Sequence, residues 1–238
     1  TITSFKKALA INPDYAKVHY NMVNTLKEQA KLEKATKSYN KAISVKPDYV
    51  EAYLNMGNAL QGQGKLEEAI HAFKQALAIK PSFAEALNSM GIALKKQGKT
   101  EEAIDAYKKA TAINPDYANA FYNMGNALKE QAKFKEAIEA HNNMGVVLQD
   151  EGKPEEAIQA YNKVLIIKPD YADAYNNMGK TLKKQGELDG AIQAYQKALS
   201  IKPSYAEAYN NMGNTLKDLG KLDKAIDAYK KALAINPN

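Results

Sequence analysis

The 238-residue chain is predicted to be an all-α solenoid, a row of stacked helix–turn–helix units. Two observations predict this class: a fixed 34-residue period, and two helix-like apolar patterns within each period. The period is marked by prolines, at Pro13, Pro47, Pro81 and Pro115 and again at Pro169, Pro203 and Pro237. A repeat of this length indicates one supersecondary element per period, stacked on its neighbours.

Residues 50–83 illustrate one repeat, and we number them as positions 1 to 34. Apolar or small residues at i, i+3, i+4 and i+7 spacing predict a first helix, with Tyr53, Met56, Gly57 and Leu60. We expect that helix to end at Gly64, because glycine commonly follows a helix C-terminus. The same spacing predicts a second helix, with Leu66, Ala69, Ile70, Phe73, Ala76 and Leu77. Pro81 ends it, since proline lacks an N–H and disfavours helix in the residue before it.

Three positions predict how the helices pack. Position 8 is glycine in six repeats and Val23 in the first, and position 20 is alanine in all seven. Small side chains at these positions allow two helix backbones to approach closely, and a larger one would overpack the contact. Position 24 is aromatic, and we expect it to fill the gap between successive repeats; it holds Phe5, Tyr39, Phe73, Tyr107, Tyr161, Tyr195 and Tyr229.

This pattern resembles the tetratricopeptide repeat (TPR) family. The small residue at position 8, Ala at 20, the aromatic residue at 24, Ala at 27 and Pro at 32 recur over the whole chain, in seven in-phase repeats. The resemblance implies a right-handed superhelix of antiparallel helix pairs whose first helices line a concave groove that binds proteins or peptides. We therefore expect a single TPR array over residues 1–238, with a partial repeat at 1–15.

The pattern is irregular near residues 137–145. Pro115 and Pro169 lie 54 residues apart instead of 68, so about 14 residues are missing from the register. One interpretation, which we favour, is that a segment has been left out, because both flanks keep normal repeat residues. The other is one long helix through the join, because fourteen residues are close to four turns and preserve the apolar face.

An asparagine column marks the candidate site. Positions 2, 6, 9 and 13 share the side of the first helix opposite its apolar stripe, the side that lines the groove in this family. The candidate peptide-binding residues at positions 6 and 9 are Asn21, Asn24, Asn55, Asn58, Asn123, Asn126, Asn143, Asn177, Lys180, Asn211 and Asn214. An amide both donates and accepts hydrogen bonds, as a peptide backbone does. The alternative is that recent duplication copied a neutral residue.

The column at position 6 resembles the asparagine ladder in the repeat domain of the O-linked N-acetylglucosamine transferase, which holds the main chain of an extended peptide. The two-carboxylate clamp of other family members is rejected, because arginine is absent and position 2 is often acidic, as at Glu51 and Glu85. No catalytic domain accompanies the column.

Composition argues against several other functions. The chain has no cysteine, and its three histidines are far apart, so we expect no metal site, no cofactor and no catalytic residue. The net charge of +6 comes from lysine alone and is interleaved with acids, which argues against nucleic-acid binding. No apolar run reaches the length of a membrane span, and no signal peptide opens the chain, so a cytoplasmic location is favoured.

The sequence therefore predicts a protein–protein interaction scaffold, not an enzyme, that binds an extended peptide or partner protein. Two alternatives remain open. One is a subunit that polymerises head to tail, because Ile2, Phe5, Ala8 and Leu9 at one end, and Ala225, Tyr229, Ala232 and Leu233 at the other, form apolar faces with no partner in the chain. The other is the non-catalytic arm of a larger glycosyltransferase- or sulfotransferase-type enzyme.

Overall fold

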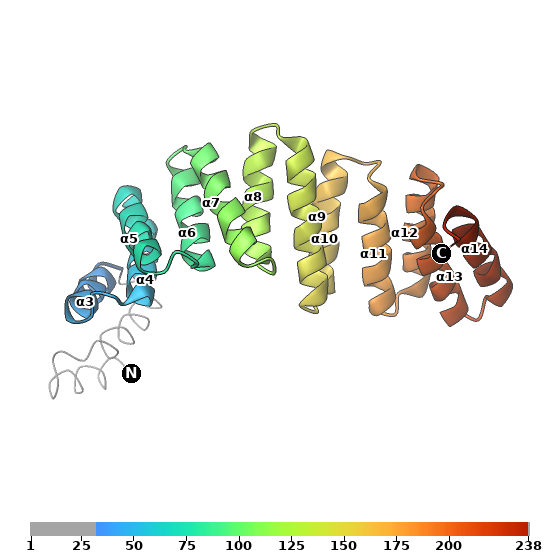
Figure 1. The fold of residues 1–238 in the computed structure, drawn as a ribbon, viewed down its shortest axis with the longest axis horizontal. Coiled ribbons are helices and arrows are strands. Elements are labelled where there is room, and N and C mark those ends of the chain that lie inside the picture. Colours follow the sequence, from blue (N-terminus) through green and yellow to red (C-terminus); the bar gives the residue numbers. More distant parts are fainter. Residues whose placement is uncertain (1–31, 238) are drawn as a thin grey trace, which may run out of the picture. The chain divides into compact units, whose positions relative to one another are not determined.

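A computed structural model describes residues 32–237 of the chain (Figure 1). In this range the chain forms twelve α-helices and no strand, which confirms the all-α solenoid of helix pairs. The helices fall into two compact units that meet after Pro115, and each is described by itself. The partial repeat at 1–15 and the candidates Asn21 and Asn24 lie outside the described residues.

The described part of unit 1, from residue 32 onwards, contains five helices, namely α3 (Leu32–Val45), α4 (Val50–Gly62), α5 (Leu66–Ile79), α6 (Ala84–Lys96) and α7 (Thr100–Ile113). Helices α4 and α5 form one hairpin, and α6 and α7 form the next. The first helices α4 and α6 also contact each other directly, as successive repeats of a solenoid require.

Unit 2 contains seven helices, namely α8 (Ala118–Glu130), α9 (Phe134–Asp150), α10 (Pro154–Ile167), α11 (Ala172–Lys184), α12 (Leu188–Ile201), α13 (Ala206–Asp218) and α14 (Leu222–Ile235). The hairpins α11–α12 and α13–α14 repeat the arrangement of unit 1. Helix α9 differs, because it pairs with both α8 and α10.

The turn inside each hairpin has the conformation that its glycine predicts. Gly64 follows α4 with φ of +78°, and the N–H of Lys65 donates to the carbonyl of Leu60 at 3.0 Å. This bond and the left-handed glycine form a Schellman motif, which ends the helix as expected. Glycines take the same conformation at 98, 152, 186 and 220, whereas the turn after α8 has Ala132 with φ of +55°.

The glycine at position 8 lies directly against the aromatic ring at position 24 of the same repeat. A Cβ built on Gly91 would lie 2.5 Å from Cε1 of Tyr107, and one on Gly179 would lie 2.5 Å from Cε1 of Tyr195. The prediction that a small residue here lets the helices approach is therefore confirmed. We expected the ring at position 24 to fill the gap between successive repeats. At this contact the ring also packs between the two helices of its own repeat.

One continuous helix spans the irregular join. Helix α9 runs over 17 residues from Phe134 to Asp150, and the interpretation that a segment has been left out of the sequence stays a prediction. Its residues satisfy two repeat patterns together, because His141 stands at position 24 of the fourth repeat and at position 4 of the fifth. Towards α8, His141 packs on Gly125, and towards α10, Gly145 packs on Tyr161. Helix α9 is thus the second helix of one hairpin and the first helix of the next.

Candidate functional site

The candidate surface of unit 2 is formed by the outward sides of the first helices α9, α11 and α13. On α9 this side carries Glu139, Asn143, Val146 and Asp150, all of which are exposed. On α11 and α13 the residues at positions 6 and 9 are half-buried, because the neighbouring helix covers part of each side chain. We call the outward side of these three helices the asparagine surface.

Hydrogen bonds join the three helices in a regular register. Nδ2 of Asn177 on α11 donates to Oδ1 of Asn142 on α9 at 3.2 Å. Nδ2 of Asn211 on α13 donates to Oδ1 of Asn176 on α11 at 3.1 Å. In both bonds the residue at position 6 reaches the residue at position 5 of the preceding first helix. The equal register shows that α9 stands to α11 as α11 stands to α13.

Asn176 is the most constrained amide of this network. Its side chain is 1% exposed. Its Nδ2 donates to the hydroxyl oxygen of Tyr205 at 3.3 Å and to Oε1 of Glu207 at 3.2 Å, while its Oδ1 accepts from Asn211. A buried amide keeps its place only when its polar atoms are bonded, and here both are.

The lysines of α11 face acids on both neighbouring first helices. Nζ of Lys180 lies 3.6 Å from Glu207 and Nζ of Lys183 lies 3.0 Å from Asp218, both on α13. On the other side, Nζ of Lys184 lies 3.9 Å from Asp150 on α9. These pairs are half-exposed, so each adds little stability, but together they neutralise the charge of the asparagine surface.

The described site candidates lie on five helices, α4, α8, α9, α11 and α13. Asn143, Asn177, Lys180, Asn211 and Asn214 lie on α9, α11 and α13. Oδ1 of Asn214 accepts a hydrogen bond from the hydroxyl of Tyr229 at 2.8 Å, so this oxygen is already bonded within its own repeat. The remaining described candidates lie on other helices: Asn55 and Asn58 on α4, and Asn123 and Asn126 on α8.

The position of α8 explains why its asparagines stand apart. His141 and Gly145 are one turn apart on α9, so α8 and α10 pack against the same side of that helix. Nζ of Lys163 on α10 accordingly lies 5.1 Å from the centre of the Tyr122 ring on α8. The outward side of α9 faces away from both. Asn123 and Asn126 therefore do not continue the row that starts at Asn143.

Sequence reasoning missed the asparagines at position 5. Asn142 and Asn176 accept the bonds that connect the first helices, although position 5 was not among the candidates. The signal was present in the sequence, because asparagine is doubled at 142–143, 176–177 and 210–211. A doubled amide places one side chain towards solvent and the next towards the neighbouring helix.

His141 is a buried titratable group beside this surface. It is 1% exposed, and its Nδ1 atom is buried without a hydrogen-bond partner. Burial, followed by the nearby charges of Lys163 and Lys129, lowers the pKa of His141 to about 4. The ring is therefore neutral at pH 7 and acts as an aromatic spacer, 6.5 Å from the Tyr122 ring between centroids.

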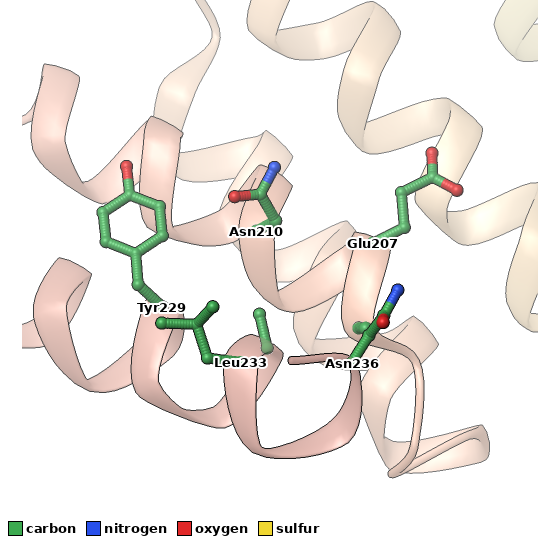
Figure 2. A pocket seen from close by; sticks show the side chains of 7 residues that line it. Glu207, Asn210, Tyr229, Leu233 and Asn236 are labelled. Atoms are coloured by element: carbon green, nitrogen blue, oxygen red, sulfur yellow. The ribbon is translucent and has the colours of Figure 1, made fainter. Parts of the chain in front are cut away.

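A hollow of about 560 Å³ opens beside α13 and α14 (Figure 2). It is lined by Ala206, Glu207, Asn210, Tyr229, Ala232, Leu233 and Asn236. One repeat earlier the equivalent residues include Ala172, Ala198 and Leu199, and there the side chains of α13 cover them. Tyr229, Ala232 and Leu233 thus form the open face that the sequence predicts. Ala225 does not, because it is buried in a cluster with Leu216 and Ile192.

Other kinds of site find no support in the described part of the chain. Residues 32–237 contain no group of three or more side chains that could hold a metal ion. None of the helices described there combines the length and apolar character that a membrane span requires.

Comparisons with known proteins agree with this architecture. The family model of the TPR repeat matches residues 24–64, 62–98, 93–131, 148–186 and 179–220, and a second model, the tetratricopeptide repeat, matches residues 206–238. The matches leave out residues 132–147, where α9 serves two repeats. A search of curated proteins gives no match.

Several solved structures are similar in part. YrrB, described as a TPR protein with an unusual peptide-binding site, is 23% identical, with a TM-score of 0.40 over 86% of this chain and 95% of its own. The MamA protein is 29% identical, with a TM-score of 0.37 over 79% of this chain and 92% of its own. A tetratricopeptide repeat protein of Parabacteroides merdae is 18% identical, with a TM-score of 0.49 over 93% of each chain.

The number of seven repeats and the likeness to a peptide-holding ladder stay predictions. The 34-residue period, the helix hairpins and the family-model matches over most of the sequence carry the broader conclusion. The chain belongs to the tetratricopeptide repeat family.

Proposed function

We propose that the asparagine surface binds the main chain of an extended peptide, which makes the protein a non-catalytic interaction scaffold. The observation that supports this is that each side-chain amide forms a hydrogen bond within the protein through its nitrogen only. Asn177 and Asn211 each donate one hydrogen bond to the neighbouring helix, and among the described residues nothing donates to their Oδ1 atoms. Those oxygens and the second amide protons remain for a ligand.

The spacing of the helices suits an extended chain. Packed helices lie about 8–10 Å apart, and an extended peptide advances about 3.3 Å per residue. Consecutive asparagines at position 6 therefore meet every third residue of the peptide. Recognition through main-chain atoms gives weak sequence preference, which suits a scaffold with several partners.

The test uses random peptides of about ten residues, long enough to cross three helices. Binders are selected against the full chain, and their affinity is measured by calorimetry. Changing Asn143, Asn177 and Asn211 together to alanine should weaken binding about 10-fold or more, since each of the three amides contributes roughly 0.5–1.5 kcal/mol. The control changes Gln159, Gln193 and Asp227, which are exposed on the second helices, to alanine.

Main-chain recognition also predicts an effect of the peptide's own chemistry. N-methylation of the peptide amides that face Asn177 and Asn211 removes the donors and should weaken binding as the triple substitution does. Full affinity after N-methylation, together with full affinity of the triple variant, would rule out this function.

Salt dependence separates peptide binding from RNA binding. The lysines of α11 already face acids on α9 and α13, so binding to the asparagine surface should change little with ionic strength. Single-stranded RNA, in contrast, would release counterions and give a steep salt slope. Tight and steeply salt-dependent RNA binding would replace our proposal.

Head-to-tail self-association is a second candidate function, favoured by the hollow beside α13 and α14. The equivalent residues one repeat earlier are covered by a first helix, so the hollow suits the corresponding helix of a second copy. Leu233→Glu should abolish concentration-dependent sedimentation. Leu222→Glu is the matched control, because both leucines are 59% exposed but Leu222 does not line the hollow. A monomer at every concentration would contradict self-association.

A further inference from the structure

Helix α14 presents an exposed apolar stripe, which we call the α14 stripe. It consists of Leu222, Ile226, Tyr229 and Leu233. These residues follow one another at spacings of four, three and four residues, so they lie on one side of the helix. Both leucines are 59% exposed and the isoleucine is 49% exposed, while the tyrosine is half-buried. The spacing is that of positions a and d in a coiled coil, in which a second helix covers the stripe.

The equivalent side of the preceding second helix is buried. In α12 the residues that correspond to Ile226 and Leu233 are Ile192 and Leu199, which are only 9% and 8% exposed. Side chains of α13 cover both of them. Among the described helices only α13 packs against α14, and it does so beside the stripe. The α14 stripe can therefore accept a helix of another chain.

The residues that flank the stripe indicate which helix fits. Asp223 and Lys230 lie along the flank that is turned away from α13, and both are exposed. Neither forms an ion pair within residues 32–237. The other flank carries Ala225 and Ala232, which are small and face α13. Flanking charges of this kind decide the partner and the direction of a helix pair.

Asp223 and Lys230 complement each other when two α14 helices run in opposite directions. In an antiparallel pair, the aspartate of each chain faces the lysine of the other, so two ion pairs form. In a parallel pair, each charge would instead face the alanine flank of the other helix. The charges therefore favour an antiparallel pair of identical helices.

We propose that the α14 stripe is the interface of a closed dimer, in which α14 packs antiparallel against α14 of a second copy. Leu222 of each chain then lies against Leu233 of the other, with the contacts between Ile226 and Tyr229 at the centre. Leu222 of the second copy enters the hollow beside Leu233 (Figure 2). Because both chains use the same surface, association stops at two copies. This inference does not depend on peptide binding by the asparagine surface.

The closed dimer differs from head-to-tail stacking, in which two unlike surfaces meet and the assembly keeps growing. The hollow takes part in both arrangements, so Leu233→Glu does not distinguish them. Leu222 does, because it belongs to the α14 stripe but does not line the hollow of its own chain. Leu222→Glu should leave head-to-tail stacking intact and should disrupt the closed dimer.

The first experiment is sedimentation of the full chain over a wide range of concentrations, which should show a dimer and no larger species. Leu222→Glu and Ile226→Glu should each weaken dimerisation about 30-fold or more, because each places unpaired carboxylates in the interface. The control is Ile166→Glu on α10, since Ile166 is 71% exposed and lies off the stripe. It should leave the dimer unchanged, and circular dichroism should show the same helicity for every variant.

A charge reversal tests the antiparallel order. Asp223→Lys should weaken the dimer about 2- to 30-fold, because lysine then faces lysine in both pairs. Adding Lys230→Asp to this variant restores two pairs of opposite charge and should return the affinity to within about 3-fold of the original. Asp227→Lys is the control, because it changes the net charge equally but lies on another side of the helix. Failure of the double substitution to restore affinity would overturn the antiparallel arrangement.

Cross-linking tests the register, because the chain has no cysteine of its own. A mixture of the Leu222→Cys and Leu233→Cys proteins should form a disulfide between the two variants on mild oxidation. Neither variant alone should do so, because the two copies of each residue lie about 16 Å apart along the pair, whereas a disulfide needs Cα atoms about 4.4–6.8 Å apart. Cross-linking of one variant with itself, a monomer at every concentration, or growing assemblies that tolerate Leu222→Glu would each overturn the inference.

Discussion

Gly125 of α8 and His141 of α9 are so close that a Cβ on the glycine would lie 2.6 Å from Cε1 of the ring. The same relationship joins Gly145 of α9 to Tyr161 of α10. Helix α9 therefore takes part in two glycine–aromatic contacts, supplying the ring to one and the glycine to the other. This geometry lets one helix replace two without a gap in the packing of unit 2.

Gly179→Ala should destabilise the protein, because the new methyl would meet the Tyr195 ring at 2.5 Å. Overpacking of this kind costs about 1–3 kcal/mol and outweighs the 0.5–1 kcal/mol that alanine gains in a helix. We expect a net loss of about 1–2 kcal/mol in the free energy of unfolding, measured by urea denaturation.

The control is Gly190→Ala in α12, where a Cβ would meet its nearest neighbour, Cδ1 of Leu182, at 3.6 Å. This substitution should stabilise the protein by about 0.5–1 kcal/mol, since only helix propensity changes. Equal effects of the two substitutions would show that the close contact has no energetic weight.

Ala132→Gly should stabilise unit 2. Ala132 ends the turn after α8 with φ of +55°, where five other turns have glycine. A left-handed conformation costs a non-glycine residue roughly 1–2 kcal/mol, and the substitution removes this cost. Glycine loses more conformational entropy on folding than alanine, which offsets part of the gain in stability. We expect a gain of about 1 kcal/mol in thermal or urea unfolding. The reverse substitution, Gly98→Ala in the equivalent turn of unit 1, should cost a similar amount.

The fold was predictable because the 34-residue period and the helix-like apolar spacing both indicate a repeated pair of helices. Proline, glycine and alanine recur at fixed positions, and each predicted a turn, a helix end or a close contact that the structure contains. A pattern that repeats several times suppresses the ambiguity of any single helix.

The site was predictable only in part. The column at position 6 follows from sequence, but hydrogen bonds between first helices depend on which neighbour each helix receives. At the join two neighbours were possible, since His141 fits position 24 of one repeat and position 4 of the next. Only three-dimensional packing shows that both assignments hold and that Asn123 and Asn143 lie on different surfaces.

Asn176→Ala should destabilise the protein more than any substitution at the exposed asparagines. It removes a side chain that is 1% exposed and breaks three hydrogen bonds, two that Nδ2 donates to Tyr205 and Glu207 and one that Oδ1 accepts from Asn211. At roughly 0.5–1.5 kcal/mol for each bond, we expect a loss of about 1.5 kcal/mol or more. Asn143→Ala on the exposed side of α9 serves as control and should change the free energy of unfolding by no more than about 0.5 kcal/mol. Similar values for the two variants would contradict the buried network.

His141 should make the stability of unit 2 sensitive to mild acid. Its pKa is about 4 in the folded protein, lowered first by burial and then by Lys163 and Lys129, against 6.5 in the unfolded chain. The unfolded chain therefore binds the proton more readily than the folded protein between these values. Stability from this group is fully present above pH 6.5 and falls as the pH decreases towards 4, by up to roughly 1.4 kcal/mol per pH unit.

His141→Phe isolates this effect, because phenylalanine already occupies both positions that His141 combines. Phe73 stands at position 24 in α5, where it packs on Gly57, and Phe121 stands at position 4 in α8. The variant should keep the contact with Gly125, bury no unpaired ring nitrogen and lose the dependence on pH between 6.5 and 4 that is specific to the histidine. Urea unfolding at pH 7, 5.5 and 4.5 measures the difference between the two proteins. Because carboxylates contribute equally to both, that difference should grow as the pH falls, and a constant difference would show that His141 is not the group that titrates.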